Sequence, residues 1–327
     1  MKFKKTFYFI SLVCLVIISC ETNPPSFSEF DDVKIKLAVV SNIDGASIFI
    51  DDVFSGKFTP DTILTDLGTH KITLTKEGFL SNSIIINVGN QTTQSIFIEL
   101  VESKVKKTVL IEDFANVSCD PCVISNKIIK NLAGKFDDQI AVIKFSTNFP
   151  SPTDPFYLSN KSSNDSRMSF YDILFAPTII IDGINRPIPT DSNEVISAIE
   201  ARLNNIPQFK IEVSDSISNN TMYVKGKVVQ LIADIELSEF RLFSSIVEEH
   251  IVYNSPPGSN GEKEFHDVLR ALLPNDQGHL LIENEDDWDF IFSSDLSSEW
   301  NINDLKSITF IQNVSTKEIV QTAVSLH

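Results

Sequence analysis

Two cysteines three residues apart, Cys119 and Cys122, constrain this chain more than any other feature. The apolar run 109–111 before them predicts a buried strand, and the apolar spacing over 122–132 after them predicts a helix. The thiols therefore lie at a strand-to-helix corner, where the first N–H groups and the helix dipole favour thiolate over thiol. Cys119 is the expected nucleophile, and Cys122, one helical turn later, is placed to resolve a mixed disulfide.

The N-terminus has the layout of a secretory leader, with lysines at 2, 4 and 5 followed by the apolar run 7–18. That run is short for a bilayer span. Residues 17–20 resemble a bacterial lipobox, which implies that residues 1–19 are removed and that Cys20 is diacylated. Two acyl chains give stable anchoring. We therefore expect a cell-envelope protein held on the outer membrane through Cys20; the alternative is an ordinary leader or anchor that happens to contain a cysteine.

The remaining cysteines are few. Cys14 leaves with the leader and Cys20 takes lipid, so only Cys119 and Cys122 remain, which gives little scope for a disulfide framework. A stapling disulfide is the alternative, although closing so short a loop removes little unfolded-state entropy. A zinc site is disfavoured because there is no second cysteine pair and the histidines at 70, 250, 266, 279 and 327 show no ligand spacing. No metal or cofactor is predicted.

The charge balance is acidic, with 27 Lys and Arg against 44 Asp and Glu and a net charge of -17. Loss of the three leader lysines makes the mature chain more acidic still. Nucleic acid is therefore excluded as an expected partner. Residues 20–32, with adjacent prolines, serines and acids, predict a polar lipidated tether.

Residues 33–101 show short alternating strands separated by turns, which predicts an all-β module. The segment resembles the PEGA domain at Gly45-Ala46-Ser47-Ile48-Phe49-Ile50-Asp51, Gly56, Thr59-Pro60, Gly68-Thr69-His70-Lys71-Ile72 and Lys76-Glu77-Gly78-Phe79. The resemblance implies a surface β module that contacts protein or glycan and has no catalytic residues. His70 is expected to be a turn residue.

Residues 104–207 alternate strands with helices, which predicts a central α/β domain. The segment resembles the thioredoxin superfamily in three places: the two cysteines, Asp113 six residues before Cys119, and Ala176-Pro177 ahead of the apolar run 178–181. The resemblance implies that Asp113 accepts the proton of the resolving cysteine. It also implies that Pro177 has a cis peptide bond and that the Ala176 backbone binds an extended substrate.

The segment also departs from that superfamily. Ser118 stands where a tryptophan is usual, and it is a candidate helix cap. Asp120 between the cysteines should raise the pKa of Cys119, so we expect a reducing or mildly oxidising pair. Glu112 and Asp113 point to opposite faces of a strand, so we expect only one of them, Asp113, to be buried.

Residues 208–327 again predict strands, arranged as a C-terminal β-sandwich. The segment resembles the Omp-twenty-eight-related outer-membrane lipoprotein family in the runs 247–250, 265–270, 308–313 and 317–321. His266, Asp267 and Arg270 could form a catalytic cluster, but no serine or cysteine nucleophile accompanies them, so a structural corner is favoured.

Two functions remain open from the sequence. The first is thiol–disulfide exchange with protein substrates or a redox partner. The second is a non-catalytic surface lipoprotein that binds protein or glycan through its β modules, with the thioredoxin-like part as scaffold. Fold class alone cannot separate the two, so whether the protein is an enzyme stays undecided.

Overall fold

The computed structural model describes residues 34–76, 78–89, 93–102, 105–231, 235–281 and 287–325. The predicted leader, the lipidated Cys20 and the tether lie outside these residues. Across the described ranges, no helix combines the length and apolar character that a membrane span needs.

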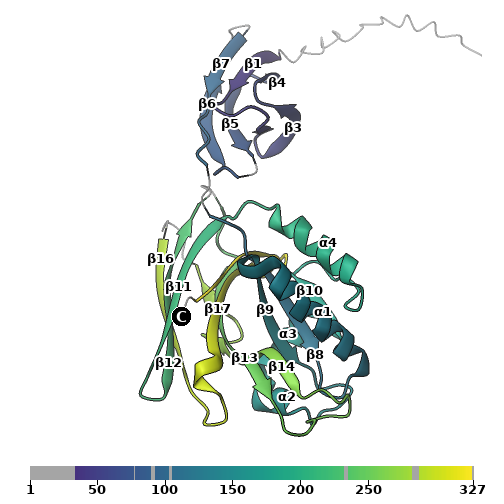
Figure 1. Ribbon diagram of the computed structural model, residues 1–327. Helices are drawn as coiled ribbons and strands as arrows, with labels where there is room; N and C mark the ends of the chain where they lie inside the picture. The colour runs from purple at the N-terminus through teal and green to yellow at the C-terminus, as the bar shows by residue number, and fades with distance from the viewer. Residues whose placement is uncertain are drawn as a thin grey trace, which may run out of the picture.

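The N-terminal module is built from seven strands in two sheets (Figure 1). One sheet has the order β4 (Asp61–Thr65), β1 (Ile35–Val40), β7 (Thr93–Phe97), and the other has the order β3 (Val53–Phe58), β2 (Ser47–Ile50), β5 (Gly68–Thr75), β6 (Asn82–Val88). Alternate residues of β1 and β4 point inward, as the period-two pattern predicts, whereas β3 has no buried residue. Leu37, Val39, Ile48, Ile72 and Leu74 form its core and are fully buried.

In the described part of the chain after the N-terminal module, eight strands form one mixed sheet. Its members are β8 (Val109–Ala115), β9 (Ile140–Ser146), β10 (Thr178–Ile181), β13 (Phe240–Val252), β14 (Glu264–Leu273), β15 (His279–Leu280), β17 (Leu305–Asn313) and β18 (Ile319–Val324). Their order is β10-β8-β9-β14-β13-β17-β18, with β15 paired to β13. The decisive junction is parallel pairing between β9 and β14, where Lys144 lies opposite Val268.

The predicted fold class is therefore wrong in its central and C-terminal parts. The described residues contain no self-contained α/β domain of the thioredoxin type, because β8, β9 and β10 belong to the same sheet as strands more than 100 residues later. The predicted C-terminal sandwich is not separate either. Its second sheet, β11 (Phe209–Ser218), β12 (Thr221–Gln230) and β16 (Asp287–Asp295), packs on the C-terminal strands of the shared sheet.

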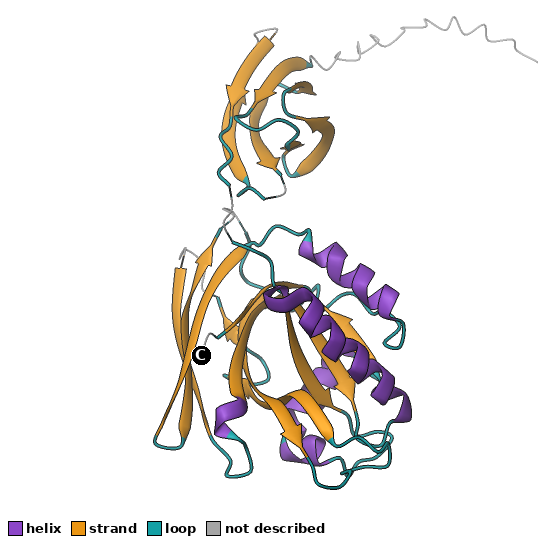
Figure 2. Ribbon diagram, in the orientation of Figure 1, coloured by secondary structure: helices purple, strands orange, loops and turns teal. Residues whose placement is uncertain are grey.

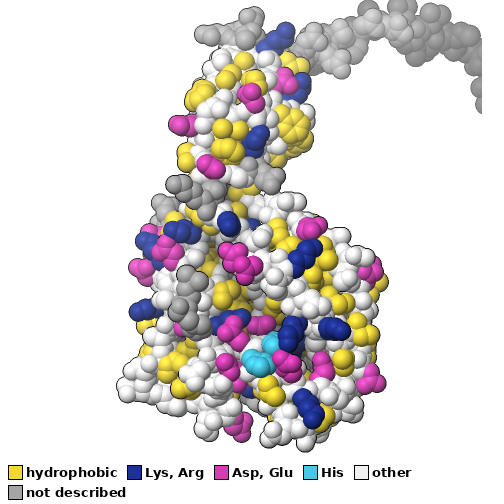
Figure 3. Space-filling model, in the orientation of Figure 1, with side chains coloured by type: hydrophobic (Ala, Val, Ile, Leu, Met, Phe, Trp, Pro, Cys, Tyr) yellow, Lys and Arg dark blue, Asp and Glu magenta, His cyan; other side chains and the backbone are white. Residues whose placement is uncertain are grey.

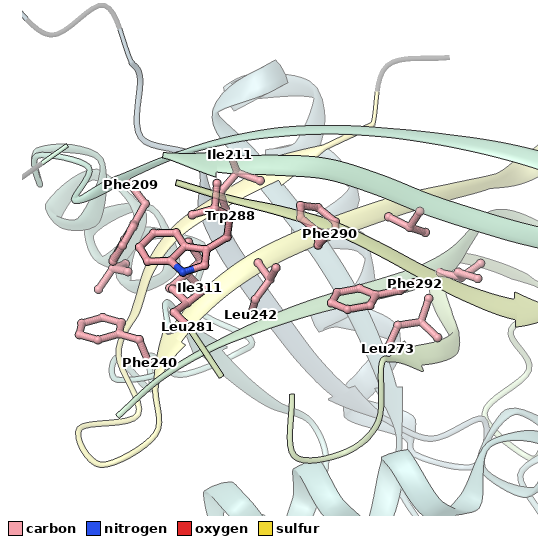
Figure 4. Packing of buried hydrophobic residues seen from close by; sticks show 14 of the residues in the cluster. Phe209, Ile211, Phe240, Leu242, Leu273, Leu281, Trp288, Phe290, Phe292 and Ile311 are labelled. Carbon is pink, nitrogen blue, oxygen red and sulfur yellow. The ribbon is translucent and has the colours of Figure 1, made fainter. Parts of the chain in front are cut away.

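That packing is shown in Figure 4, where Phe209, Ile211 and Trp288 from the small sheet meet Leu242 and Ile311 from the large one. All five side chains are buried or nearly so. Burying a large apolar side chain stabilises a fold by about 1.5–3 kcal/mol, so this interface binds the two sheets into one unit.

Helices cover the shared sheet at its β8–β10 end (Figure 2). They are α1 (Asp120–Phe136), α2 (Pro155–Ser159), α3 (Lys161–Tyr171) and α4 (Ser192–Leu203), with short 3-10 turns at Asp137–Gln139 and Ile302–Asp304. Val109 and Ile111 face α1 and α4, whereas Leu110 faces α3 and the opposite core. The sequence offers Asp191 or Ser192 as the cap of α4, and Asp191 takes that place, because its side chain accepts from the N–H of Asn193 at 2.9 Å.

Candidate functional site

The two cysteines lie where β8 gives way to α1 and are joined as a disulfide. Cys119 is the N-cap of α1 and makes no side-chain cap hydrogen bond. The turn before it is held by Asp154, whose carboxylate accepts from the N–H groups of Val117 and Phe156, both at 2.8 Å. Burial raises the pKa of Asp154 above its ordinary value, and these hydrogen bonds oppose the rise.

Both cysteines are buried: Cys119 is 2% exposed and Cys122 is fully covered. The loop 253–263 between β13 and β14, here called the capping loop, lies against the turn that carries them. The Asn260 N–H donates to the Val117 carbonyl at 3.2 Å, and the Ser259 N–H donates to the Ser118 hydroxyl at 3.2 Å. Ser118 thus binds the capping loop. The sequence had suggested that it caps α1, but the N-cap of that helix is Cys119.

The approach of the capping loop to the cysteine turn depends on a glycine. A Cβ atom built at Gly258 would collide with the backbone and side chain of Val117. The Asn260 side chain adds a long contact, 3.4 Å, to the Cys119 carbonyl. The loop therefore lies directly against the turn that presents Cys119.

The peptide bond between Ala176 and Pro177 is cis, as the sequence predicted. Ala176 packs against Cys119 and Cys122, while Pro177 is buried. The two residues before Ala176 are exposed to solvent: Leu174 is 80% exposed and Phe175 is 66% exposed. On the other flank, Val123 and Ile124 directly follow Cys122 and are also exposed apolar residues. These four exposed apolar residues, here called the apolar rim, directly precede Ala176 (174 and 175) or directly follow Cys122 (123 and 124) in the sequence.

Asp113 is fully buried beside this site and forms an ion pair with Lys144. Lys144 also donates to the Asn126 side-chain oxygen at 2.6 Å, and Asn126 donates to Glu262 at 2.9 Å. Glu262 in turn accepts from Asn260 at 2.7 Å. A continuous polar chain therefore runs from Asp113 through α1 to the capping loop.

The prediction that only one of the adjacent acids is buried is wrong. Glu112 is also fully buried, on the opposite face, where it accepts from Arg167 Nε at 2.9 Å and from the Tyr171 hydroxyl at 2.6 Å. Burial raises the pKa of Tyr171 well above its ordinary range. Both carboxylates tolerate burial because each has a cationic partner on its own face.

The residues that the sequence grouped as a possible catalytic cluster have separate partners. Arg270 binds Glu248 at 2.7 Å, and Asp267 binds Lys306 at 2.8 Å. The His266 Nδ1 atom contacts the Glu249 carbonyl at 3.2 Å. These contacts fit the structural corner that the sequence favoured.

Sequence reasoning missed Lys144, Asn126 and the whole capping loop. These residues carry no motif. Lys144 lies opposite Asp113 through the pairing of β8 with β9, and the capping loop reaches the cysteine turn because β14 pairs with β9. The sequence patterns therefore predicted the two cysteines but not the loop that packs against their turn.

Comparison with known proteins identifies the N-terminal module. Residues 34–104 match the PEGA domain family, so this prediction is confirmed. A search of curated proteins found no match.

Among solved structures, HBP35 of Porphyromonas gingivalis is similar at 12% identity and a TM-score of 0.56, covering 68% of this chain and 76% of that one. Protein AGR_C_4864 from Agrobacterium tumefaciens has 11% identity and a TM-score of 0.46, covering 68% of this chain and 96% of that one. A domain of the outer membrane lipoprotein Omp28 from Porphyromonas gingivalis has 14% identity and a TM-score of 0.27, covering 37% and 88%. The likeness to HBP35 shows a shared fold over about two thirds of the chain.

Proposed function

We propose that this chain is a cell-envelope protein, anchored through lipid on Cys20 at the outer membrane, whose Cys119–Cys122 pair exchanges disulfides with a partner protein. The envelope location is supported by the leader, the lipobox-like residues 17–20 and the PEGA domain. Exchange is supported by the disulfide itself, packed against Ala176 ahead of the cis proline.

The observation that carries the redox proposal is the apolar rim beside Ala176 and Cys122. Leu174 and Phe175 are neighbours in the sequence and are 80% and 66% exposed to water, which is unfavourable for apolar side chains. Groups of exposed apolar side chains mark interaction sites. The rim lies next to Ala176, whose backbone would pair with an extended partner segment. A partner thiol would thus be delivered beside Cys119.

The exchange itself follows the ordinary chemistry of disulfides. A partner thiolate attacks the Cys119 sulfur, the bond to Cys122 breaks, and Cys122 leaves as a thiolate that takes up a proton. A second partner thiol then attacks the mixed disulfide and releases Cys119, so the partner is oxidised by two electrons and the chain is reduced. Asp113 and Lys144 are the buried charges available to stabilise and protonate Cys122.

The burial of Cys119 adds a condition to this mechanism. In-line attack requires an open path to the sulfur, but Cys119 is buried and the capping loop is hydrogen-bonded to the turn that carries it. Exchange therefore requires the loop to move away from residues 117–119.

The test has two parts, both on the chain from Glu21 onward. Equilibration with glutathione buffers should give a reversible couple between about -270 and -120 mV. In the Cys122→Ser variant, the Cys119 thiolate can attack the disulfide of an oxidised envelope protein and release that partner's second thiolate, which is the same exchange in the reverse direction. The resulting mixed disulfide should stay trapped, and Cys119→Ser should trap none. A bond that stays closed well below about -300 mV, with no trapped species, would make the disulfide structural.

A second function is favoured by an aromatic cluster on the PEGA module. The Phe54 ring lies between Phe49 and Phe58, tilted against the first with ring centroids 5.4 Å apart and edge-to-face with the second at 5.7 Å. Phe54 and Phe58 are 46% and 52% exposed. Exposed aromatic rings suit binding of a sugar face or an apolar protein segment. If this surface binds an envelope glycan or protein, Phe54→Ser should abolish binding, whereas Leu64→Ser, an exposed change on another sheet, should not.

A further inference from the structure

The β13–β14 hairpin carries a second polar cluster that the disulfide does not use. His250 on β13 lies directly opposite His266 on β14, and their rings are parallel with centroids 5.0 Å apart. Glu264 is two residues before His266 and so shares its face. One ligand atom from each of the three residues lies within 4.8 Å of the other two. We propose that His250, Glu264 and His266 form a binding site for a divalent transition-metal ion, with zinc as the best fit.

The hydrogen bonding of His266 indicates that this ring presents a ligand atom. Its Nδ1 lies 3.2 Å from the Glu249 carbonyl oxygen, which can only accept, so Nδ1 holds the proton. The neutral ring then has its lone pair on Nε2. A backbone carbonyl on the far nitrogen is the usual way in which a protein fixes the tautomer of a metal-binding histidine.

The Nε2 atom of His266 is buried and has no hydrogen-bond partner. Glu264 Oε1 lies only 3.2 Å away, but a carboxylate oxygen is also an acceptor. In the neutral form of the ring, two lone pairs face each other across a short gap, and a cation bound between them removes that repulsion and satisfies both atoms.

The donor set selects the metal. Two imidazoles and one carboxylate suit zinc and its neighbours, and they leave a fourth position open to water. Calcium and magnesium prefer oxygen ligands and are disfavoured.

The geometry requires one adjustment. Zinc–ligand bonds of about 2.0–2.2 Å bring ligand atoms closer together than the present cluster does, so one ring must tilt. His250 is the ring able to do so, because its side chain is 46% exposed. The histidines visible in Figure 3 lie at the surface among lysine and acidic side chains, so an ion can reach them from solvent.

Lys130 of α1 competes for the same position. Its ammonium lies 2.9 Å from Glu264 Oε1, the oxygen that also contacts His250 Nε2 at 3.0 Å. A metal ion bound at Glu264 must displace this lysine or share the carboxylate with it. Removal of the lysine charge should therefore strengthen metal binding.

The proposal is tested by titrating zinc chloride calorimetrically into the chain from Glu21 onward, with the disulfide intact and any affinity tag removed. One ion should bind per chain. His250→Ala and His266→Ala should each weaken binding at least about tenfold, as loss of a metal-site residue does. Lys130→Gln should tighten it about threefold, the size expected of one exposed charge pair. His279→Ala, an exposed histidine outside the cluster, should change nothing.

Three outcomes would overturn the proposal. They are absence of saturable zinc binding by the unaltered chain, binding that survives both histidine substitutions, and weaker binding in Lys130→Gln. If a histidine variant folds poorly, the Lys130→Gln variant still tests the proposal, because it is expected to bind zinc more tightly and poor folding cannot produce that result. A Cys119→Ser, Cys122→Ser double variant should bind zinc unchanged, which shows that no trace of reduced thiol contributes to the site.

Discussion

Removal of the Asn260 side chain should increase the rate at which the Cys119–Cys122 disulfide is reduced. This side chain donates to Glu262 at 2.7 Å and accepts from the Glu262 N–H at 3.0 Å, and it makes the longer contact to the Cys119 carbonyl. Asn260→Ala deletes all of these and leaves the backbone bond to Val117 in place. The variant therefore weakens the closed capping loop without altering the cysteines.

The magnitude follows from the one side-chain contact of Asn260 that joins the loop to the cysteine turn, the contact to the Cys119 carbonyl. It contributes up to about 1 kcal/mol, so opening of the loop becomes easier by about that amount. At about 1.36 kcal/mol per factor of ten, the open population rises about fivefold. If reductant reaches Cys119 only through the open state, the reduction rate rises by the same factor.

The assay is pseudo-first-order reduction by a phosphine, with quenching, alkylation of free thiols and intact-mass detection. Asn275→Ala is the matched control, because Asn275 makes a turn hydrogen bond of 2.8 Å to Gln277 in the loop after β14. The control should reduce at the unaltered rate. If Asn260→Ala also does so while both variants unfold at the same urea concentration, the capping loop does not gate the disulfide.

Other predictions concern the packing that holds the site. Arg167→Leu leaves Glu112 buried without its cation and should cost about 3–5 kcal/mol of unfolding free energy, seen as a lower urea midpoint; an unchanged midpoint would contradict the argument. Burial raises the pKa of Asp154, so the folded state binds its proton more tightly, and this contribution to stability is lost as pH rises above the ordinary value of 3.8. Stability of Asp154→Asn relative to the unaltered chain should therefore increase between pH 4 and neutrality, and a constant difference would refute it. Thr59→Val removes the acceptor of the buried Ala46 N–H, at 3.0 Å, and should destabilise the PEGA module by about 1–3 kcal/mol in a thermal melt that resolves the module.

Local elements could be predicted from the sequence because their signals are local. The apolar run 109–111 became β8, the spacing after Cys122 became α1, and Asp191 caps α4. The turn chemistry of the N-terminal module was equally readable, since Gly45 and Gly56 hold positive φ angles that side chains rarely adopt.

The sheet that joins these elements could not be predicted in the same way. Periodicity shows which face of a strand is buried, but it says nothing about which strand lies beside it. The parallel pairing of β9 with β14 joins residues 144 and 268, and no short-range pattern encodes that choice. The error over Glu112 has the same origin, since its burial depends on Arg167 arriving from α3 on the far face.

The site was predictable in part for the same reason. Cys119, Cys122 and the cis bond before Pro177 came from motifs, whereas the capping loop and the facing histidines depend on the β13–β14 register. His250 and His266 are 16 residues apart, which fits no ligand spacing, yet the hairpin places them directly opposite each other. Spacing rules for metal ligands assume helices and turns and overlook cross-strand pairs.

The same hairpin carries both proposed sites, which leads to a prediction that neither site makes alone. The capping loop begins three residues after His250 and ends immediately before Glu264. A metal ion bound by His250, Glu264 and His266 links β13 to β14 at the end of the hairpin from which the capping loop extends. The ion therefore opposes separation of the capping loop from β9 and α1.

Zinc should therefore slow reduction of the Cys119–Cys122 disulfide, because an ion that binds only the ordered hairpin stabilises it by mass action. In the phosphine assay, saturating zinc should lower the rate in the unaltered chain and leave it unchanged in His266→Ala. The Asn260→Ala variant should remain sensitive to zinc, since its metal ligands are intact. An equal rate with and without zinc, under conditions where calorimetry shows the ion bound, would mean that the loop opens without disturbing the ladder and that the two sites act independently.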